Sequence, residues 1–300
     1  MSNRPDFIII GAMKCGTSTL HAQLAAQPGI VMSEPKEPNF FSDDEQYARG
    51  HDWYASLFAS AAAGELAGEA STHYTKLPTY PQTVPRMKEA LPEVRLIYVM
   101  RDPIQRLVSQ YIHEWTMRQI DGDIETALAH HDELVTYSCY GMQTRPYFDA
   151  YGRDAVLPVF AERLRLDPQH ELERIAAFIG YRGRVLWQTD ADAQNVSSER
   201  LRQCWWRDLL TDAPGLRQIR QHLVPQWVRD RIKALWQMKQ RPDLSPQTVA
   251  DLKAQLDEDL HLLTPWLGKR ITCDTYRDIA TQPMPIPTPP GKPATTLAST

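Results

Sequence analysis

Cysteine is scarce in this chain. Only four occur in 300 residues, namely Cys15, Cys139, Cys204 and Cys273, and no two are spaced as a CxxC pair. A disulfide framework or a cysteine metal cluster needs several cysteines at paired spacings, so neither is predicted. We expect reduced thiols, as in a cytosolic protein.

An excess of positive charge, long apolar segments and metal-binding motifs are also missing. The formal net charge is −4 and the lysines and arginines form no runs, which argues against nucleic acid as a partner. No apolar segment is long enough to span a membrane. The first one, residues 7–10, stops at a glycine loop and is expected to be a core strand instead of a signal sequence. The sequence contains no HExxH, CxxC or DxD cluster that would suggest a metal.

The chain is large enough for a substantial core. With 42% hydrophobic residues in 300, we expect one domain over residues 1–280. The last twenty residues hold six prolines, so residues 281–300 are expected to be a disordered tail. Residues 188–236 are rich in tryptophan, which indicates either a lid over a binding site or helices with buried aromatics; the tryptophans are Trp205, Trp206, Trp227 and Trp236.

Residues 7–20, FIIIGAMKCGTSTL, predict a phosphate-binding loop. A strand over residues 7–10 is followed by Lys14 between two glycines, and then by hydroxyl residues that open a helix expected over 17–27. The free backbone N–H groups and the dipole of a helix N-terminus favour an anion. A Walker A loop has its lysine after the second glycine and is two residues longer, so this loop suits one phosphate better than a metal-bound triphosphate. The alternative is an ordinary turn with a solvated Lys14.

A second segment points to another anion site. Residues 94–100, VRLIYVM, predict a buried strand, and RDPIQRLVSQYIHEW follows, with Pro103 suited to the first turn of a helix. Helical spacing places Arg106, Ser109, Gln110 and His113 on one face. Arg101 at the strand end and Ser109 in the helix could bind an anion together. The alternative is that these arginines form surface ion pairs.

Together the two segments resemble the sulfotransferases that depend on 3′-phosphoadenosine-5′-phosphosulfate (PAPS). The family patterns GxxKxGT[ST]xL and R[DN]PxxRxxSxY are both complete here and about ninety residues apart. The resemblance implies a three-layer α/β fold of P-loop type, with a central, mainly parallel sheet between helices. It implies that Arg101 and Ser109 bind the 3′-phosphate. It places the 5′-phosphosulfate on the loop residues Lys14, Cys15, Gly16, Thr17, Ser18 and Thr19.

Residues 36–41, KEPNFF, are similar to the KEPxFF segment of the branch that includes heparan sulfate sulfotransferases. That resemblance makes Glu37 the general base and Lys36 a second cation near the transferred group, beside Lys14. The alternative for Glu37 is a surface carboxylate. Residues 68–74, GEASTHY, depart from the family, because Ala70 stands where a lysine is often found. Cationic help from that position is therefore lost.

Several further residues are weaker candidates. His113 would project from the same helix face as Ser109 and could act on the acceptor, and His73 could line the same opening. Tyr140 and Arg145 lie where relatives often place a nucleotide contact. Cys15 stands at a helix N-terminus, where a thiol can become unusually acidic, although a passive small residue is the simpler interpretation.

Other elements follow from local signals. Helices are expected near residues 52–58, from residue 104, and over 124–131 and 244–268, with short strands near Ile30 and over 156–160. Residues 167–180 predict a helix that starts at Asp-Pro and stops at Gly180. We see no internal repeat.

The sequence thus predicts an enzyme that moves the sulfuryl group of PAPS to a hydroxyl or amine and releases PAP. The acceptor could be a small molecule, a lipid or a carbohydrate, and no metal is expected. Because the chain does not begin with the membrane anchor of eukaryotic Golgi relatives, we expect a cytoplasmic protein of bacterial type. A P-loop phosphotransferase and a non-catalytic protein that binds PAP or another nucleotide are the alternatives.

Overall fold

The computed structural model describes residues 4–189 and 241–287. Its centre is a sheet with the strand order β2-β3-β1-β4-β5, in which every pair of neighbours is parallel. The tryptophans of the 188–236 tract and residues 288–300 of the expected tail lie outside the described residues. The predicted α/β fold with a mainly parallel sheet is confirmed. The strands are β1 (Phe7–Gly11), β2 (Ile30–Met32), β3 (Leu66–Ala70), β4 (Arg95–Met100) and β5 (Val156–Phe160).

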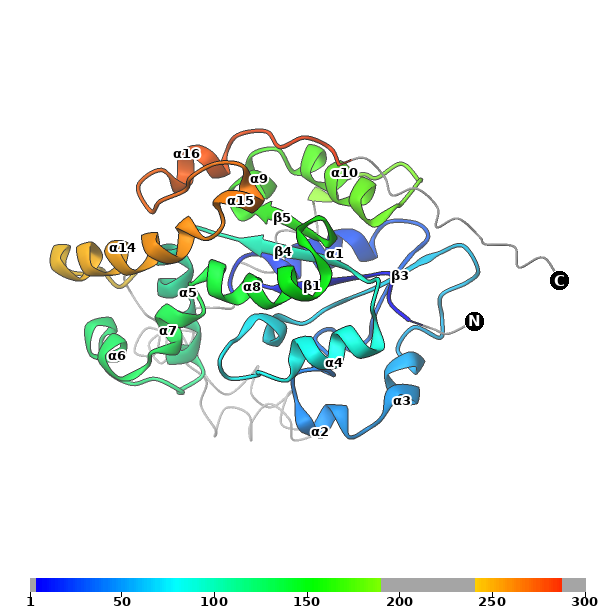
Figure 1. Cartoon of the computed structure of the whole chain (residues 1–300), viewed down its shortest axis with the longest axis horizontal. Helices are drawn as coiled ribbons and strands as arrows, with labels where there is room; N and C mark the ends of the chain where they lie inside the picture. The colour runs from blue at the N-terminus through cyan, green and yellow to red at the C-terminus, as the bar shows by residue number, and fades with distance from the viewer. Residues whose placement is uncertain (1–3, 190–240, 288–300) are drawn as a thin grey trace, which may run out of the picture.

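Helices cover both faces of the sheet. Figure 1 shows α4 and α8 in front of the strands and α1 behind them. The first group of helical elements is α1 (Thr17–Ala25), α2 (Asp44–Tyr47), α3 (His51–Ser56), η1 (Thr72–Thr75), α4 (Thr83–Ala90), α5 (Pro103–Thr116), α6 (Ile124–His130) and α7 (Glu133–Thr136). The second is α8 (Tyr140–Tyr151), η2 (Arg153–Ala155), α9 (Ala161–Leu166), α10 (Pro168–Ile179), α14 (Pro246–His261), α15 (Thr264–Leu267) and α16 (Tyr276–Ala280).

The two strands that precede the predicted anion sites are adjacent and buried. Every residue of β1 is buried, and so are five of the six residues of β4. Strands buried on both faces read as continuous apolar runs, which is why both were visible in the sequence. Their pairing brings the loop after β1 next to Arg101 after β4.

The helix α14 is hydrogen-bonded to the start of α8. The carboxylate of Asp259 accepts hydrogen bonds from the backbone N–H groups of Gly141 and Met142, at 2.7 and 2.8 Å. These N–H groups belong to the first turn of α8, which has no partner for them within the helix. A residue of α14 therefore caps α8 from outside.

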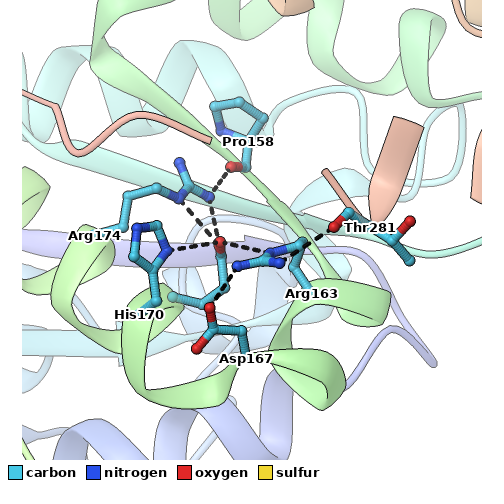
Figure 2. Close-up of polar contacts among 7 residues, drawn as sticks. Pro158, Arg163, Asp167, His170, Arg174 and Thr281 are labelled. Atoms are coloured by element: carbon cyan, nitrogen blue, oxygen red, sulfur yellow. Dashed lines mark hydrogen bonds and ion pairs between the residues drawn. The ribbon is translucent and has the colours of Figure 1, made fainter. Parts of the chain in front are cut away.

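A buried ion cluster joins α9, α10 and β5 (Figure 2). The fully buried Glu171 accepts hydrogen bonds from Arg174 at 2.9 and 3.1 Å and lies 3.5 Å from Nε of Arg163. Arg163 also pairs with Asp167 at 2.9 Å and donates to the backbone carbonyl of Thr281 at 3.2 Å. One carboxylate between two guanidinium groups thus fixes α9 against α10 and against the segment after α16.

Candidate active site

A cleft of about 620 Å³ opens outside the carboxyl ends of the strands. This is where open parallel sheets bind ligands, and the volume is that of a typical small-molecule site. The cleft brings together most of the residues that the sequence singled out. It is lined by Met13, Lys14, Gly16, Thr17, Ser18, Thr19, Glu37, Thr72, His73, Lys76, Arg101, Ser109, Ile112, His113, Arg165 and Arg241.

The loop after β1 has the backbone of an anion cradle. Gly16 caps α1 with φ 92°, a left-handed conformation that favours glycine, and the space where its Cβ would stand is open. Lys14 also has a positive φ, 67°. Such a conformation costs a non-glycine residue about 1–3 kcal/mol and tends to occur at functional sites. The N-terminus of α1 therefore faces the cleft with Lys14 beside it.

Gly11 holds the start of this loop close to the next element. A Cβ at Gly11, where φ is 151°, would lie 1.9 Å from Oγ1 of Thr75. That hydroxyl donates a hydrogen bond to the carbonyl of Ile10 at 2.9 Å. Only glycine allows this approach, so η1 packs against the end of β1.

Arg101 is held by its backbone and reaches the phosphate loop with its side chain. The hydroxyl of Tyr140 donates to the carbonyl of Arg101 at 2.6 Å and accepts from its N–H at 3.3 Å. The guanidinium donates to the carbonyl of Lys14 at 3.4 Å. Asp102 caps α5 by accepting from the N–H of Gln105 at 2.8 Å. The two predicted anion sites are therefore joined directly.

The helix face toward the cleft differs from the predicted one. Ser109 and His113 line the cleft with Ile112, but Arg106 and Gln110 are fully buried. Arg106 donates to Oγ of Ser138 at 2.6 Å and to the carbonyl of Leu134 at 2.7 Å. Spacing along the helix did not reveal this burial, which is possible because α7 and the segment after it offer Arg106 enough acceptors to bury its charge.

Tyr140 and Arg145 do not contact a nucleotide site directly. Tyr140 is fully buried behind the strand end and positions Arg101 through its hydroxyl. Arg145 is exposed on α8 and pairs with Asp149 at 3.2 Å. Neither is among the residues that line the cleft, so the structure does not support them as nucleotide contacts.

Cys15 is a passive buried residue. Its side chain is 1% exposed, and Sγ lies 3.8 Å from the hydroxyl of Tyr140. Burial raises the pKa of this thiol to about 11, and the nearby positive charge of Arg106 lowers it only in part. The alternative of an acidic, reactive thiol was wrong, because the residue faces the core and not the helix N-terminus.

We therefore expect slow alkylation of Cys15. At a pH well below 9, the thiolate fraction should be about 100-fold smaller than for a thiol with an ordinary pKa near 9, since each pKa unit is a factor of ten. Mass spectrometry of the Cys15 peptide after timed iodoacetamide treatment at neutral pH measures this. The denatured protein is the control, and labelling of the native protein at the denatured rate would contradict the prediction.

Glu37 lies across the cleft from the phosphate loop on a constrained backbone. Its φ is 57°, and its N–H donates to the carbonyl of Ala70 at 3.1 Å. Oε1 pairs with Nζ of Lys36 at 2.7 Å, and Oε2 accepts from the hydroxyl of Thr72 at 3.1 Å. Burial acts to raise the pKa of Glu37, but Lys36, Thr72 and His73 together bring it below its usual value. The carboxylate is therefore ionised at neutral pH.

Lys36 connects the two sides of the site. Its ammonium donates to Oγ of Ser18 at 3.0 Å as well as to Glu37. Ser18 belongs to the first turn of α1, so the KEP segment contacts the phosphate loop through this one side chain. Any group bound between them lies within reach of a cation and a carboxylate.

His73, a weaker candidate, is placed on the cleft wall beside Glu37. Its ring stacks on Tyr80, with centroids 4.8 Å apart. Burial is the main reason that its pKa falls below the usual value, with the charge of Lys76 acting in the same direction. The imidazole is therefore neutral at physiological pH.

The sequence argument missed Thr72, Lys76, Arg165 and Arg241 among the lining residues. Thr72 lies in η1 and Lys76 directly after it, in the segment that follows β3. β3 was not predicted, so nothing indicated that these residues reach the cleft. Arg165 is in α9, far along the chain from the motifs. An arginine in a helix carries no local signal that distinguishes a cleft residue from an exposed one.

The described residues contain no group of three or more His, Cys, Asp or Glu side chains placed to hold a metal ion. Within the same residues, no helix is both long enough and apolar enough to cross a membrane.

A family model described as a sulfotransferase domain matches residues 4–209. The chain is 36% identical over 136 residues to the membrane-associated sulfotransferase kil1 of Dictyostelium discoideum, a match that covers 43% of this chain and 28% of that protein. It is 29% identical over 189 residues to mouse heparan sulfate glucosamine 3-O-sulfotransferase 3B1, covering 59% of this chain and 46% of the relative. The chain thus spans less than half the length of these relatives.

A solved structure shares the fold. The crystal structure of a sulfotransferase from Alicyclobacillus acidocaldarius superposes with a TM-score of 0.61 at 23% identity. The superposition covers 89% of this chain and 97% of that one.

Proposed function

The chain belongs to the PAPS-dependent sulfotransferase family, and we propose that it transfers the sulfuryl group of PAPS to an acceptor hydroxyl or amine and releases PAP. The observation that carries this proposal is the Lys36 ammonium, which contacts the phosphate loop at Ser18 and the carboxylate of Glu37 at once. The proposed donor site and the proposed base are therefore bridged by a single side chain, that of Lys36. This is the arrangement that a direct transfer between two bound substrates requires.

The charge of the cleft suits the donor. Among its described lining residues the positive side chains are Lys14, Lys76, Arg101, Arg165 and Arg241, and the only carboxylate is that of Glu37. PAPS carries a 5′-phosphosulfate and a 3′-phosphate, both anionic. We assign the 5′ side to the α1 N-terminus with Lys14 and residues 15–19, where Cys15 can contribute only its backbone. The 3′-phosphate is assigned to Arg101 and Ser109.

The proposed chemistry follows from these positions. Glu37 takes the proton of the acceptor as the acceptor oxygen or nitrogen attacks sulfur, and the bond from sulfur to the bridging oxygen of the phosphate breaks. Lys14 neutralises the charge that develops on that oxygen, and Lys36 stabilises the group in transit between donor and acceptor. Catalysis of this kind rests on positioning and charge stabilisation, so no metal is required. His113 is assigned to orienting the acceptor.

The acceptor is proposed only as a class. A hydroxyl or amine on a small molecule, lipid or carbohydrate fits the chemistry of Glu37. The mouse relative described above is named for heparan sulfate, a carbohydrate, which favours a glycan. Cytoplasmic location and bacterial origin stay predictions.

The test of the proposal is PAP release from labelled PAPS across a panel of sugar, phenol, amine and lipid acceptors. Acceptor-dependent release of PAP with label on the acceptor supports it. If the protein binds PAP tightly but forms no PAP from PAPS with any acceptor of the panel, the result would support a non-catalytic binding protein instead. Transfer of phosphate from ATP with Mg²⁺ would support a phosphotransferase, which the position of Lys14 before Gly16 disfavours.

We expect PAP to bind far more tightly than ADP. Each charge-assisted contact of Arg101 and Ser109 with the 3′-phosphate should contribute about 1.5–3 kcal/mol. Titration calorimetry with both nucleotides measures the preference, and Arg101→Ala should remove most of it. Arg145→Ala is the matched control, since Arg145 is exposed and away from the cleft. Equal affinity of the native protein for PAP and ADP would contradict the donor assignment.

A further inference from the structure

Lys76 is a cation of the cleft to which the proposed transfer gives no role. It directly follows η1, on the same side of the cleft as Thr72 and His73. Its side chain is partly buried, and burial lowers the pKa of the ammonium below its usual value. A buried ammonium is costly unless it is paired, so its presence at a binding site calls for a partner.

The described residues do not supply that partner. No carboxylate among them lies within 4.0 Å of the Lys76 ammonium, which faces the ring of Tyr137, with the centroid 5.7 Å from Nζ. Glu37, Glu114 and Asp43 act on Lys76 only through space. The carboxylate of Glu37 is already bonded on both oxygens, to Lys36 and to Thr72.

Lys76 is not among the residues assigned to PAPS, and it is close to the assigned base. It directly follows η1, whose Thr75 bonds the carbonyl of Ile10 at the end of β1, and its ammonium faces the ring of Tyr137. The charge of Glu37 is the largest of those that act on Lys76, and Glu37 is itself bound to the strand before η1 through its backbone bond to Ala70 of β3. A charge bound by Lys76 would therefore belong to the molecule whose proton Glu37 removes.

Resting on the proposed function, we propose that Lys76 binds an anionic group of the acceptor and selects acceptors that carry a carboxylate, sulfate or phosphate near the reacting group. Lys76 thereby supplies the cation that Ala70 cannot provide. It lies six residues later in the chain, at the other end of η1. Tyr80, stacked on His73, and Tyr137, hydrogen-bonded to Thr79 at 2.6 Å, flank this position with aromatic rings. They favour a ring-shaped acceptor body next to the charge.

Matched pairs of acceptor probes test this inference. Para-nitrophenyl glucuronide and para-nitrophenyl glucoside differ by one carboxylate, as do para-hydroxybenzoate and para-hydroxybenzyl alcohol. Binding of each to the PAP-loaded protein is measured by calorimetry. We expect the charged member of at least one pair to bind more tightly, and Lys76→Met to weaken that binding by about tenfold or more, as for loss of a charge-assisted contact. Binding of the neutral member should change less than about twofold.

Two variants separate charge from structure. Lys76→Arg keeps the charge and should retain the preference. Lys253→Met removes an exposed lysine of α14, which pairs with Asp274, and should behave as the native protein. The inference is overturned if neither charged probe binds better than its neutral partner, or if the preference persists in Lys76→Met.

The same titrations distinguish this inference from the proposed function. Normal PAP affinity in native protein and in Lys76→Met, with no charge preference for acceptors, would reject only the role of Lys76. Failure of the native protein to bind PAP would reject the donor site, and the role of Lys76 with it.

Discussion

Glu37→Gln should lower turnover by about 10²–10⁴ while PAP affinity stays close to that of the native protein. The amide keeps the size of the side chain and can still accept hydrogen bonds from Lys36 and Thr72, but it cannot take the acceptor proton, and general base catalysis is worth about this factor. Steady-state rates at saturating PAPS and calorimetry with PAP measure the two quantities.

His113→Ala is the comparison for that variant. We expect a smaller loss, partly in acceptor affinity, because His113 is assigned to orienting the acceptor. A dead His113→Ala variant together with near-normal turnover in Glu37→Gln would transfer the role of base to His113.

The pairing of Glu37 with Lys36 predicts how the rate depends on pH if Glu37 is the base. Since positive charge and hydrogen bonding hold the pKa of Glu37 below its usual value against the effect of burial, the base is ionised above that pKa and activity falls only as the pH drops through it. Lys36→Met should raise the pKa and move the acidic limb of the rate profile to higher pH. A limb that stays in place would show that another group titrates.

Glu171→Gln should destabilise the protein by about 3–5 kcal/mol. The substitution leaves the guanidinium groups of Arg163 and Arg174 buried without their shared counter-charge, and breaking a buried ion pair from one side costs about this much. Urea denaturation, followed by circular dichroism, measures the free energy of unfolding.

Asp149→Asn provides the matched control. It neutralises a carboxylate that pairs with Arg145 on the surface, where both side chains are about two-thirds exposed, so the loss should be within about 1 kcal/mol. Equal effects of the two substitutions would mean that the cluster in Figure 2 contributes no more than a surface pair.

The sequence predicted the elements whose signal is local. β1 and β4 are continuous apolar runs, and β5 was predicted with its observed bounds. The helix α10 lies between Asp167 and Gly180, the predicted start and stop signals. β3 was missed because four of its five residues, LAGEA, are alanine, glycine or glutamate, which have low strand propensity. Its place in the sheet comes from pairing with β1 on one side and β2 on the other.

The same limit applied to the site. Lys14, Arg101, Ser109 and Glu37 could be predicted because each lies in a contiguous motif, and the structure brings all of them to one cleft. Lys76 and Arg165 could not, because their presence there depends on how β3 and α9 pack. Arg106 is the converse case. Spacing placed it on one helix face with Ser109 and His113, but spacing does not show that α7 and the residues after it bury the Arg106 side chain.

The strand order also has a consequence for how new specificities could arise. Because β2 and β3 lie together on one side of β1, the stretch from residue 33 to residue 80, which includes β3, supplies Glu37, Thr72, His73 and Lys76 to the cleft as one continuous piece of chain between the two nucleotide motifs. Exchange of that stretch between homologues would replace these residues while leaving the loop after β1 and Arg101 unchanged. In such a fold the residues proposed to bind the donor could stay constant, while the stretch from residue 33 to residue 80 changes with the acceptor.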